Sequence, residues 1–509
     1  MSPDVVVLTS AISSLEAEWV FIPIARDETS VPVDGVDAAT GGELSRAILS
    51  GEFKAKQYRV FATPVTARDW RARRIALVGA GDVDRFDATL LRRLASVAGL
   101  FARDRKAATA AFVCRQPARA PEAGSGLSPA TLAQAIAEGL MFATFDAAAY
   151  KTEDHDEWEP ERFIVSLPGG DEETRHRASE VVRRGVVLSE CVNTSRGLAN
   201  EPGNRLRPRE FADRAAQIVS KAGLQVAVLD EARIAELGMG LLLGVARGSE
   251  EPPRLLAIEY QPPRGPAPGP VLGLVGKGVT FDTGGLSIKP SQGMERMKDD
   301  MAGGAAVIGA LCAIARLSAP IRVIGVVPIA ENMPSGHAIR PGDVLRSASG
   351  KTVEVLDTDA EGRLILGDAL WYARQRGATH LVDIATLTGA CTIALGHAVS
   401  GLFARPSKWA QTVQDVADRA GDCVWPMPLC DDYFELLRSD IADLKNVGGR
   451  AAGAITAAIF LGQFVGDRPW AHLDIAGTAW NEDAKEYLPK GPTGAGVKTL
   501  AELAFADLP

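Results

Sequence analysis

The chain has 509 residues, of which 46% are hydrophobic and 23% are charged, and its formal net charge at pH 7 is −9. This length and composition predict two to four domains with sizeable cores, and the acidic balance argues against a general affinity for nucleic acid. No apolar run approaches the roughly 18 residues that a membrane-spanning helix needs, so we expect no membrane segment.

Strand and helix signals alternate along the first third of the chain, which predicts an α/β fold. The strand-like runs and the helical periodicities are found at residues 5–8, 74–79, 90–102 and 131–143. Residues 171–188 begin charged and become amphipathic, as a helix joining two units would. We expect a non-catalytic N-terminal α/β domain over residues 1–172, with a role in assembly or regulation. A second domain over residues 173–509 would begin with the joining helix.

A first charged cluster follows a short apolar strand at residues 271–276. Lys277 and Asp282 come directly after it, at the carboxyl end where α/β sheets bind ligands. Lys289 follows, and Asp300 stands immediately before a small-residue helix. Gly276-Lys277-Gly278 lacks the spacing of a phosphate-binding loop, which argues against nucleotide binding here. The proline-rich segment 261–270, upstream of this strand, is expected to form a surface loop.

A second charged cluster, residues 357–363, places three carboxylates and one guanidinium before a helix at residues 364–373. If the segment is extended, Asp359 and Glu361 leave the backbone on the same side, as ligands of a divalent cation would. The simpler interpretation is a helix N-cap with solvated acids. The first cluster favours the metal interpretation, because Asp300 also stands at a helix start. The sequence contains no HExxH motif, which excludes a thermolysin-like zinc site.

Several motifs resemble, in the same order, those of the leucine (cytosol) aminopeptidase family: Lys277-Gly278, Phe281-Asp282-Thr283-Gly284-Gly285, Ser287-Ile288-Lys289-Pro290, Asp300-Met301 and Thr358-Asp359-Ala360-Glu361-Gly362-Arg363-Leu364. The resemblance continues through segments 383–390, 442–446, 472–477 and 491–496, and it covers roughly residues 190–505. It implies a smaller N-terminal α/β domain joined by a helix to a larger α/β catalytic domain with a mixed central sheet.

The resemblance also implies a site for two divalent metals, with manganese or zinc expected. One metal would be held by Lys277, Asp282, Asp300 and Glu361, and the other by Asp282, Asp359 and Glu361. Four carboxylates balance two dications, and such a pair can clamp both the attacking and the carbonyl oxygen. A lysine ligand must lose its proton, which burial beside a dication would favour.

The implied activity is that of a leucyl aminopeptidase, which hydrolyses the N-terminal residue from short peptides with a metal-bridged water. Lys289 would stabilise the oxyanion electrostatically, and Arg363 would hold a bicarbonate-like anion that relays the proton. The substrate side chain, leucine or similar, would be bound by Met297, Thr386, Leu387 and Gly389. Two alternatives stay open: a non-proteolytic two-metal hydrolase, and a regulatory or DNA-binding protein on the same fold.

Asp357 departs from the family, which usually has Asn at this position. The extra carboxylate could raise the local negative potential and alter metal preference. It could equally accept the same turn hydrogen bonds as Asn, and this is the interpretation we favour.

Assembly and location are expected from the resemblance and from cysteine usage. The family implies a homohexamer of two stacked trimers. The six cysteines show no CxxC spacing and are typical of reduced thiols, so we expect a cytoplasmic protein.

Overall fold

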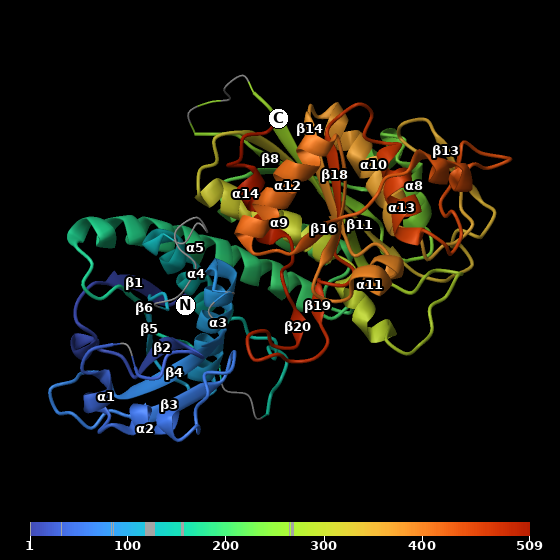
Figure 1. The fold of residues 1–509 in the computed structure, drawn as a ribbon. Helices are drawn as coiled ribbons and strands as arrows, with labels where there is room; N and C mark the ends of the chain where they lie inside the picture. The colour runs from blue at the N-terminus through green and yellow to red at the C-terminus, as the bar shows by residue number, and fades with distance from the viewer. Residues whose placement is uncertain are drawn as a thin grey trace. The chain divides into compact units, whose positions relative to one another are not determined.

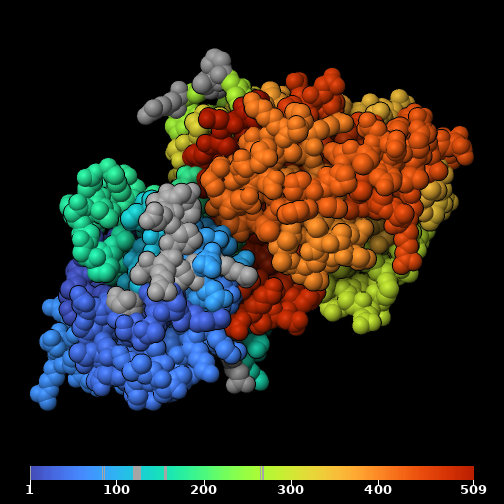
Figure 2. Space-filling view, in the orientation of Figure 1, coloured from blue at the N-terminus to red at the C-terminus, as the bar shows by residue number. Residues whose placement is uncertain are grey.

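The computed structural model describes residues 2–31, 33–82, 84, 86–117, 128–153, 157–263, 265 and 269–509. The chain forms two compact units (Figure 1). Unit 1 contains Met1–Asn193 and Asp483–Lys490, and unit 2 contains Thr194–Glu482 and Gly491–Pro509. Figure 2 shows the surface of each unit, with unit 1 mainly in blue and unit 2 mainly in green to red.

Unit 1 is built on a six-stranded sheet with the order β1-β6-β5-β2-β4-β3. Five strands are parallel and β3 is antiparallel. The strands, in that order, are Asp4–Leu8, Arg162–Ser166, Thr109–Val113, Trp19–Ala25, Arg74–Gly81 and Val60–Pro64. The strands expected at 5–8 and 74–79 are therefore confirmed as parts of β1 and β4.

Two separate apolar cores lie on the two faces of this sheet. The short helices α1 (Val36–Ala39) and α2 (Glu43–Leu49) pack on one face, and α3 (Ala88–Arg103) and α4 (Pro129–Phe142) pack on the other. The carboxylate of Asp87 accepts a hydrogen bond from the Leu90 N–H and caps the start of α3. Both helices expected in this part are confirmed.

Helix α5 (Glu172–Asn200) runs from unit 1 into unit 2. It begins where the sequence predicts the joining helix, but it ends twelve residues later than residue 188. Leu188, Cys191, Val192 and Leu198 are all buried, so an apolar face continues at helical spacing past the charged part.

Unit 2 is built on a nine-stranded mixed sheet, which confirms the expected sheet type. The main path is β16-β15-β18-β14-β9-β11-β8-β7, and β10 pairs with β11. β15 is antiparallel to β18, and β8 is antiparallel to both β11 and β7, while the other pairs are parallel. The nine strands are Val424–Pro426, Ser400–Arg405, Trp470–Asp474, His380–Ala385, Val271–Gly276, Arg322–Asn332, Arg254–Tyr260, Gln225–Leu229 and, for β10, Gly278–Asp282.

Helices cover both faces of this sheet, so that the central strand β9 contacts α9 on one side and α10 on the other. The helices of unit 2 are α6 (Pro208–Lys221), α7 (Glu231–Glu236), α8 (Gly240–Ala246), α9 (Ala302–Arg316), α10 (Gly362–Gln375), α11 (Gly389–Leu395), α12 (Ser407–Ala420), α13 (Gly453–Gly462) and α14 (Val497–Leu503). The short elements are η1 (Ile12–Ser14) in unit 1 and, in unit 2, η3 (Met294–Asp299), η4 (Asp431–Leu437), β12 (Val344–Arg346), β13 (Thr352–Glu354), β17 (Leu444–Lys445), β19 (Trp480–Asn481) and β20 (Gly491–Pro492).

Small residues bring α9 against the end of β9. A Cβ on Gly303 would lie 2.2 Å from the Ile384 carbonyl oxygen, and the Gly304 N–H donates to the Lys277 carbonyl at 2.7 Å. The start of α9 is thereby fixed beside Lys277.

The proline-rich segment connects β8 to β9, and its residues 264 and 266–268 lie outside the described residues. Within the described ranges, no helix is both long and apolar enough to cross a membrane.

Candidate metal centre

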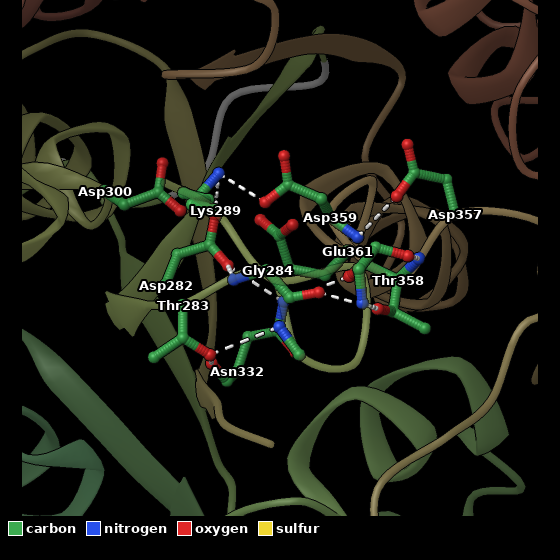
Figure 3. A network of polar contacts seen from close by, with 12 residues as sticks. Asp282, Thr283, Gly284, Lys289, Asp300, Asn332, Asp357, Thr358, Asp359 and Glu361 are labelled. Atoms are coloured by element: carbon green, nitrogen blue, oxygen red, sulfur yellow. Dashed lines mark hydrogen bonds and ion pairs between the residues drawn. The ribbon is translucent and has the colours of Figure 1, made fainter. Parts of the chain in front are cut away.

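Four segments of unit 2 bring charged side chains together. Lys277 follows β9, and Asp282 is the last residue of β10. Asp300 stands two residues before α9, and Asp359 and Glu361 come directly before α10. Figure 3 shows Asp282, Asp300, Asp359 and Glu361 converging from these segments, together with Lys289 from the loop after β10. The carboxyl-end placement expected for the first cluster is thus found in the structure.

Lys277 lies at the inner end of this cluster and is only 3% exposed. Its Nζ lies 2.8 Å from either oxygen of Asp300 and 2.7 Å from Oε1 of Glu361. Burial alone would lower the pKa of Lys277, but the carboxylates of Asp300, Glu361 and Asp282 together hold that pKa above its usual value. A dication in the same place would instead favour the neutral amine.

Lys289 lies at the outer end of the cluster. Its Nζ is 2.7 Å from Oδ2 of Asp282 and also contacts Oδ1 of Asp359 (Figure 3). Its backbone N–H donates to the Thr283 carbonyl at 2.9 Å, which ties the loop after β10 back onto the strand end. The side chain is partly exposed, so its ammonium lies between the buried carboxylates and solvent.

The carboxylates fit a hard or borderline dication. One oxygen each of Asp282, Asp359 and Glu361 lies within 4.8 Å of the others. Among the described residues, Oε2 of Glu361 has no hydrogen-bond partner, and Oε1 contacts the ammonium of Lys277. Burial raises the pKa of both Asp300 and Glu361, and burial with the charge of Asp282 raises the pKa of Asp359 to about 6. Crowded, poorly hydrogen-bonded carboxylates of this kind are stabilised by a bound cation.

Two asparagines hold the backbone around the cluster. Sequence reasoning missed Asn332, and it placed Asn446 inside a family motif without giving it a role. Asn332, the last residue of β11, donates through Nδ2 to Oδ1 of Asp282 at 2.8 Å and to the Thr358 carbonyl at 3.0 Å. Asn446 accepts from the Leu356 N–H at 2.8 Å and donates to the Asp357 carbonyl at 2.6 Å. Asn332 could have been found from its position, because it is a polar residue at the carboxyl end of a strand, where α/β sheets bind ligands.

The segment carrying Asp359 and Glu361 is a turn, so the prediction of an extended segment is wrong. Oδ1 of Asp357 accepts the Asp359 N–H at 2.9 Å, and Glu361 has helical angles, φ −76° and ψ −35°. This hydrogen bond is the one that an Asn side chain would also accept. The two carboxylates therefore point to the same place because of this turn, which Asn446 holds, and not because side chains alternate along a strand.

Arg363 lies in the first turn of α10 and is 7% exposed. Its Nη1 donates to the Asn446 carbonyl at 2.8 Å, and its Nε has no hydrogen-bond partner among the described residues. Burial lowers the pKa of Arg363 to about 10, although Glu361, Asp474 and Asp357 oppose this shift. The hydrogen bond from Nη1 ties Arg363 to the loop of Asn446. Spare donors on a buried cation suit an anionic ligand.

The four residues expected to bind the substrate side chain lie on two segments. Thr386 contacts the cluster directly, because its Oγ1 donates to Asp300 at 2.7 Å and its carbonyl accepts from Lys277 at 3.0 Å. Leu387 is half-buried and Gly389, the first residue of α11, is exposed. Met297 is half-buried on η3, three residues before Asp300.

Asp474, the last residue of β18, anchors the loop that carries these residues. Its Oδ1 accepts the Leu387 and Thr388 N–H groups at 3.3 and 3.4 Å, and its Oδ2 accepts the Thr388 hydroxyl at 2.6 Å. Asp474 is 1% exposed. Sequence reasoning placed it inside a family motif and gave it no role.

Comparisons with known proteins cover nearly the whole chain. The model of the cytosol aminopeptidase family's catalytic domain matches residues 193–501, and that of its N-terminal domain matches residues 21–154. A probable cytosol aminopeptidase of Solibacter usitatus is 46% identical over 494 residues, covering 97% of each chain. One of Alkaliphilus metalliredigens is 42% identical over 506 residues, covering 98% of each.

Solved structures are similar over the same extent. A bottromycin maturation enzyme in complex with Mn has a TM-score of 0.82 and 37% identity, with 96% of this chain and 99% of that one covered. A mutant of tomato leucine aminopeptidase has a TM-score of 0.88 and 32% identity, with coverage of 99% and 96%.

Proposed function

The chain belongs to the cytosol aminopeptidase family and is a metal-dependent aminopeptidase, and from this premise we propose that it removes N-terminal leucine and similar residues from short peptides. The observation that carries the proposal is the convergence of Asp282, Asp359 and Glu361 beside Lys277 and Asp300. A carboxylate-rich cluster at the carboxyl end of a sheet suits hydrolysis assisted by hard cations.

The proposed metal ligands fall into two sets. Lys277, Asp282, Asp300 and Glu361 would hold one divalent metal, and Asp282, Asp359 and Glu361 would hold the other. Bound there, two dications supply Lewis-acid polarisation of the peptide carbonyl and a water nucleophilic at neutral pH. Manganese and zinc both suit this donor set.

Lys289 and Arg363 act on charge and protons. The ammonium of Lys289, held at the outer edge of the cluster by Asp282 and Asp359, stabilises negative charge on the carbonyl oxygen as the bond to water forms. Arg363, whose Nε has no hydrogen-bond partner among the described residues, would hold a bicarbonate-like anion, and such an anion would supply a proton relay between the attacking water and the leaving amine.

Substrate selection follows from charge and from the anchored loop. The free α-amine of the peptide would bind one of the two metals, so cleavage would stop at the first residue. Met297 and the loop of Thr386, Leu387 and Gly389 receive the first side chain, and their apolar groups favour leucine-sized residues.

We also propose that the chain acts in the cytoplasm as a homohexamer, on the basis of family resemblance. Sedimentation at micromolar concentration tests this assembly. A particle six times the 53.8 kDa chain mass is expected, and a stable monomer would refute it.

Three substrates separate this function from a two-metal hydrolase of another bond. The manganese-loaded protein is assayed on leucine-p-nitroanilide, on its N-acetylated form and on p-nitrophenyl phosphate. We expect turnover of the first compound only, because the others lack the free α-amine or the peptide carbonyl. Equal turnover of the acetylated compound would refute exopeptidase action, and preferred phosphoester turnover would support the other hydrolase.

A further inference from the structure

The sheet of unit 1 has a switch point at the carboxyl ends of β2 and β4. The chain leaves β2 towards α1 and α2, which belong to one apolar core, and leaves β4 towards α3, which belongs to the other. The two strands are parallel neighbours. Ligands of open α/β sheets bind in the crevice outside the carboxyl ends of such strands.

A cavity of about 450 Å³ lies at this position. Ile24 and Arg26 reach it from the end of β2, Ile48 from α2, and Phe53, Lys54 and Lys56 from the loop before β3. Its volume lies within the range of small-molecule sites, roughly 300–1,000 Å³. It is lined entirely by residues of unit 1, whereas the metal centre is formed by residues of unit 2.

The loop that carries the two lysines is fixed on the end of β4. The Gly81 N–H donates to the Ala55 carbonyl at 3.1 Å, and the Tyr58 N–H donates to the Gly79 carbonyl at 2.8 Å. A Cβ on Gly79 would lie 2.1 Å from the Lys56 carbonyl oxygen, so the two backbones touch. Ala55 has a positive φ of 46°, a costly conformation for a residue with a side chain. Strain retained in a rigid loop is typical of binding sites.

Positive charge exceeds negative charge around the cavity. Lys54 and Lys56 are exposed, and neither forms an ion pair with a residue that the structure describes. The carboxylate of Glu28 is compensated by Arg115, whose Nη1 lies 2.9 Å from Oε2. Arg26 pairs with Asp82 at 3.0 Å, but both side chains are more than half exposed, so this pair is weak.

Part of the lining of this cavity is apolar. Ile24 is fully buried, Phe53 is 5% exposed and Ile48 is half-buried, and all three line the cavity. We propose that this cavity is a second ligand site that binds a small organic phosphate, with the phosphate on Lys54 and Lys56 and the apolar part against Ile48 and Phe53. A nucleoside monophosphate has this chemistry, because its phosphate can contact the two ammonium groups and its base and sugar can pack on the apolar residues.

Calorimetric titration of the full-length, manganese-loaded protein tests this site with three probes: adenosine monophosphate, adenosine and inorganic phosphate. Adenosine monophosphate should bind saturably and more tightly than either fragment, because only it contacts both the lysines and the apolar residues of the lining. The Lys54→Ala/Lys56→Ala double variant should weaken its binding about tenfold or more, as loss of charge-assisted contacts predicts. Turnover of leucine-p-nitroanilide without the nucleotide should stay unchanged.

A matched double variant, Lys151→Ala/Lys221→Ala, removes the same charge from two exposed lysines elsewhere. It should retain the affinity of the unmodified chain. The proposal is overturned if none of the probes binds saturably up to about 10 mM. It is also overturned if Lys54→Ala/Lys56→Ala binds as tightly as the unmodified chain, or if both double variants lose affinity equally.

Discussion

Nζ of Lys277 lies 2.7 Å from Oε1 of Glu361, and this contact joins the end of β9 to the start of α10. The same ammonium contacts Asp300 before α9, so one side chain touches both charged clusters. Gly362 makes the approach possible, because a Cβ there would lie 2.7 Å from Nζ of Lys277. The site is therefore a single packed unit rather than two independent helix caps.

Asp357→Asn should leave activity and manganese affinity within about twofold of the unmodified chain. The amide oxygen can accept the Asp359 N–H as Oδ1 of Asp357 does, so the turn is kept. Asp357→Ala removes the acceptor, at a cost of about 1 kcal/mol, and should lower both quantities. Steady-state turnover across a manganese titration measures this. If Asp357→Asn changed metal preference or affinity as much as Asp357→Ala did, the charge of Asp357 would matter instead of its hydrogen bond.

Asp474→Ala should lower kcat/KM for leucine-p-nitroanilide by about tenfold or more. Three donors of Leu387 and Thr388 lose their acceptor, each worth about 1 kcal/mol, and the loop also carries Thr386, which contacts Lys277 and Asp300.

Asp474→Asn keeps one acceptor oxygen and should recover part of this loss. Asp418→Ala, an exposed change on α12, is the matched control and should be neutral. Thermal melting must accompany the kinetics. If kcat/KM fell in proportion to the melting temperature in both Asp474 variants, Asp474 would have a structural role only.

The stability of the fold should depend on pH through Asp368 of α10. This carboxyl is fully buried, and burial raises its pKa to about 7 although the Leu241, Leu242 and Ala348 N–H groups donate to it. Its pKa in the unfolded chain is about 3.9. The folded state thus binds more protons between these values, and this residue's contribution to stability falls as pH rises from about 4 to about 7.

Asp368→Asn stays neutral at every pH and should lack this contribution. The melting temperature of Asp368→Asn relative to the unmodified chain should therefore rise from pH 4 to pH 7 and stay level above pH 7. A relative melting temperature that is flat or falls over that interval would contradict the raised pKa. Differential scanning calorimetry at matched ionic strength makes the comparison.

The sequence could predict the position of site residues that lie next to a recognisable strand or helix. The apolar run of β9 and the small-residue start of α9 predicted where Lys277, Asp282 and Asp300 would meet. The mixed sheet and the two-unit organisation followed from the family motifs and from strand and helix alternation.

Long-range contacts were not accessible in this way. The extended geometry expected for Asp359 and Glu361 is wrong because Asn446, far along the chain, holds this segment as a turn. Its side chain accepts a hydrogen bond from the backbone of the turn and donates another to it. Residues 483–490 return to unit 1, where the Tyr487 carbonyl accepts a hydrogen bond from Ser96 on α3 at 2.8 Å. Neither partner is distinguished by composition or periodicity.

The most direct test of the proposed centre follows bound manganese and turnover together while the chelated protein is titrated. The unmodified chain should bind two manganese ions at saturation, and leucine-p-nitroanilide turnover should rise with them. Glu361→Gln should bind fewer and lose about 100-fold or more in turnover, because both metals lose a charged ligand. The exposed control Glu236→Gln should behave as the unmodified chain does. Two bound ions and full turnover in Glu361→Gln would contradict the account.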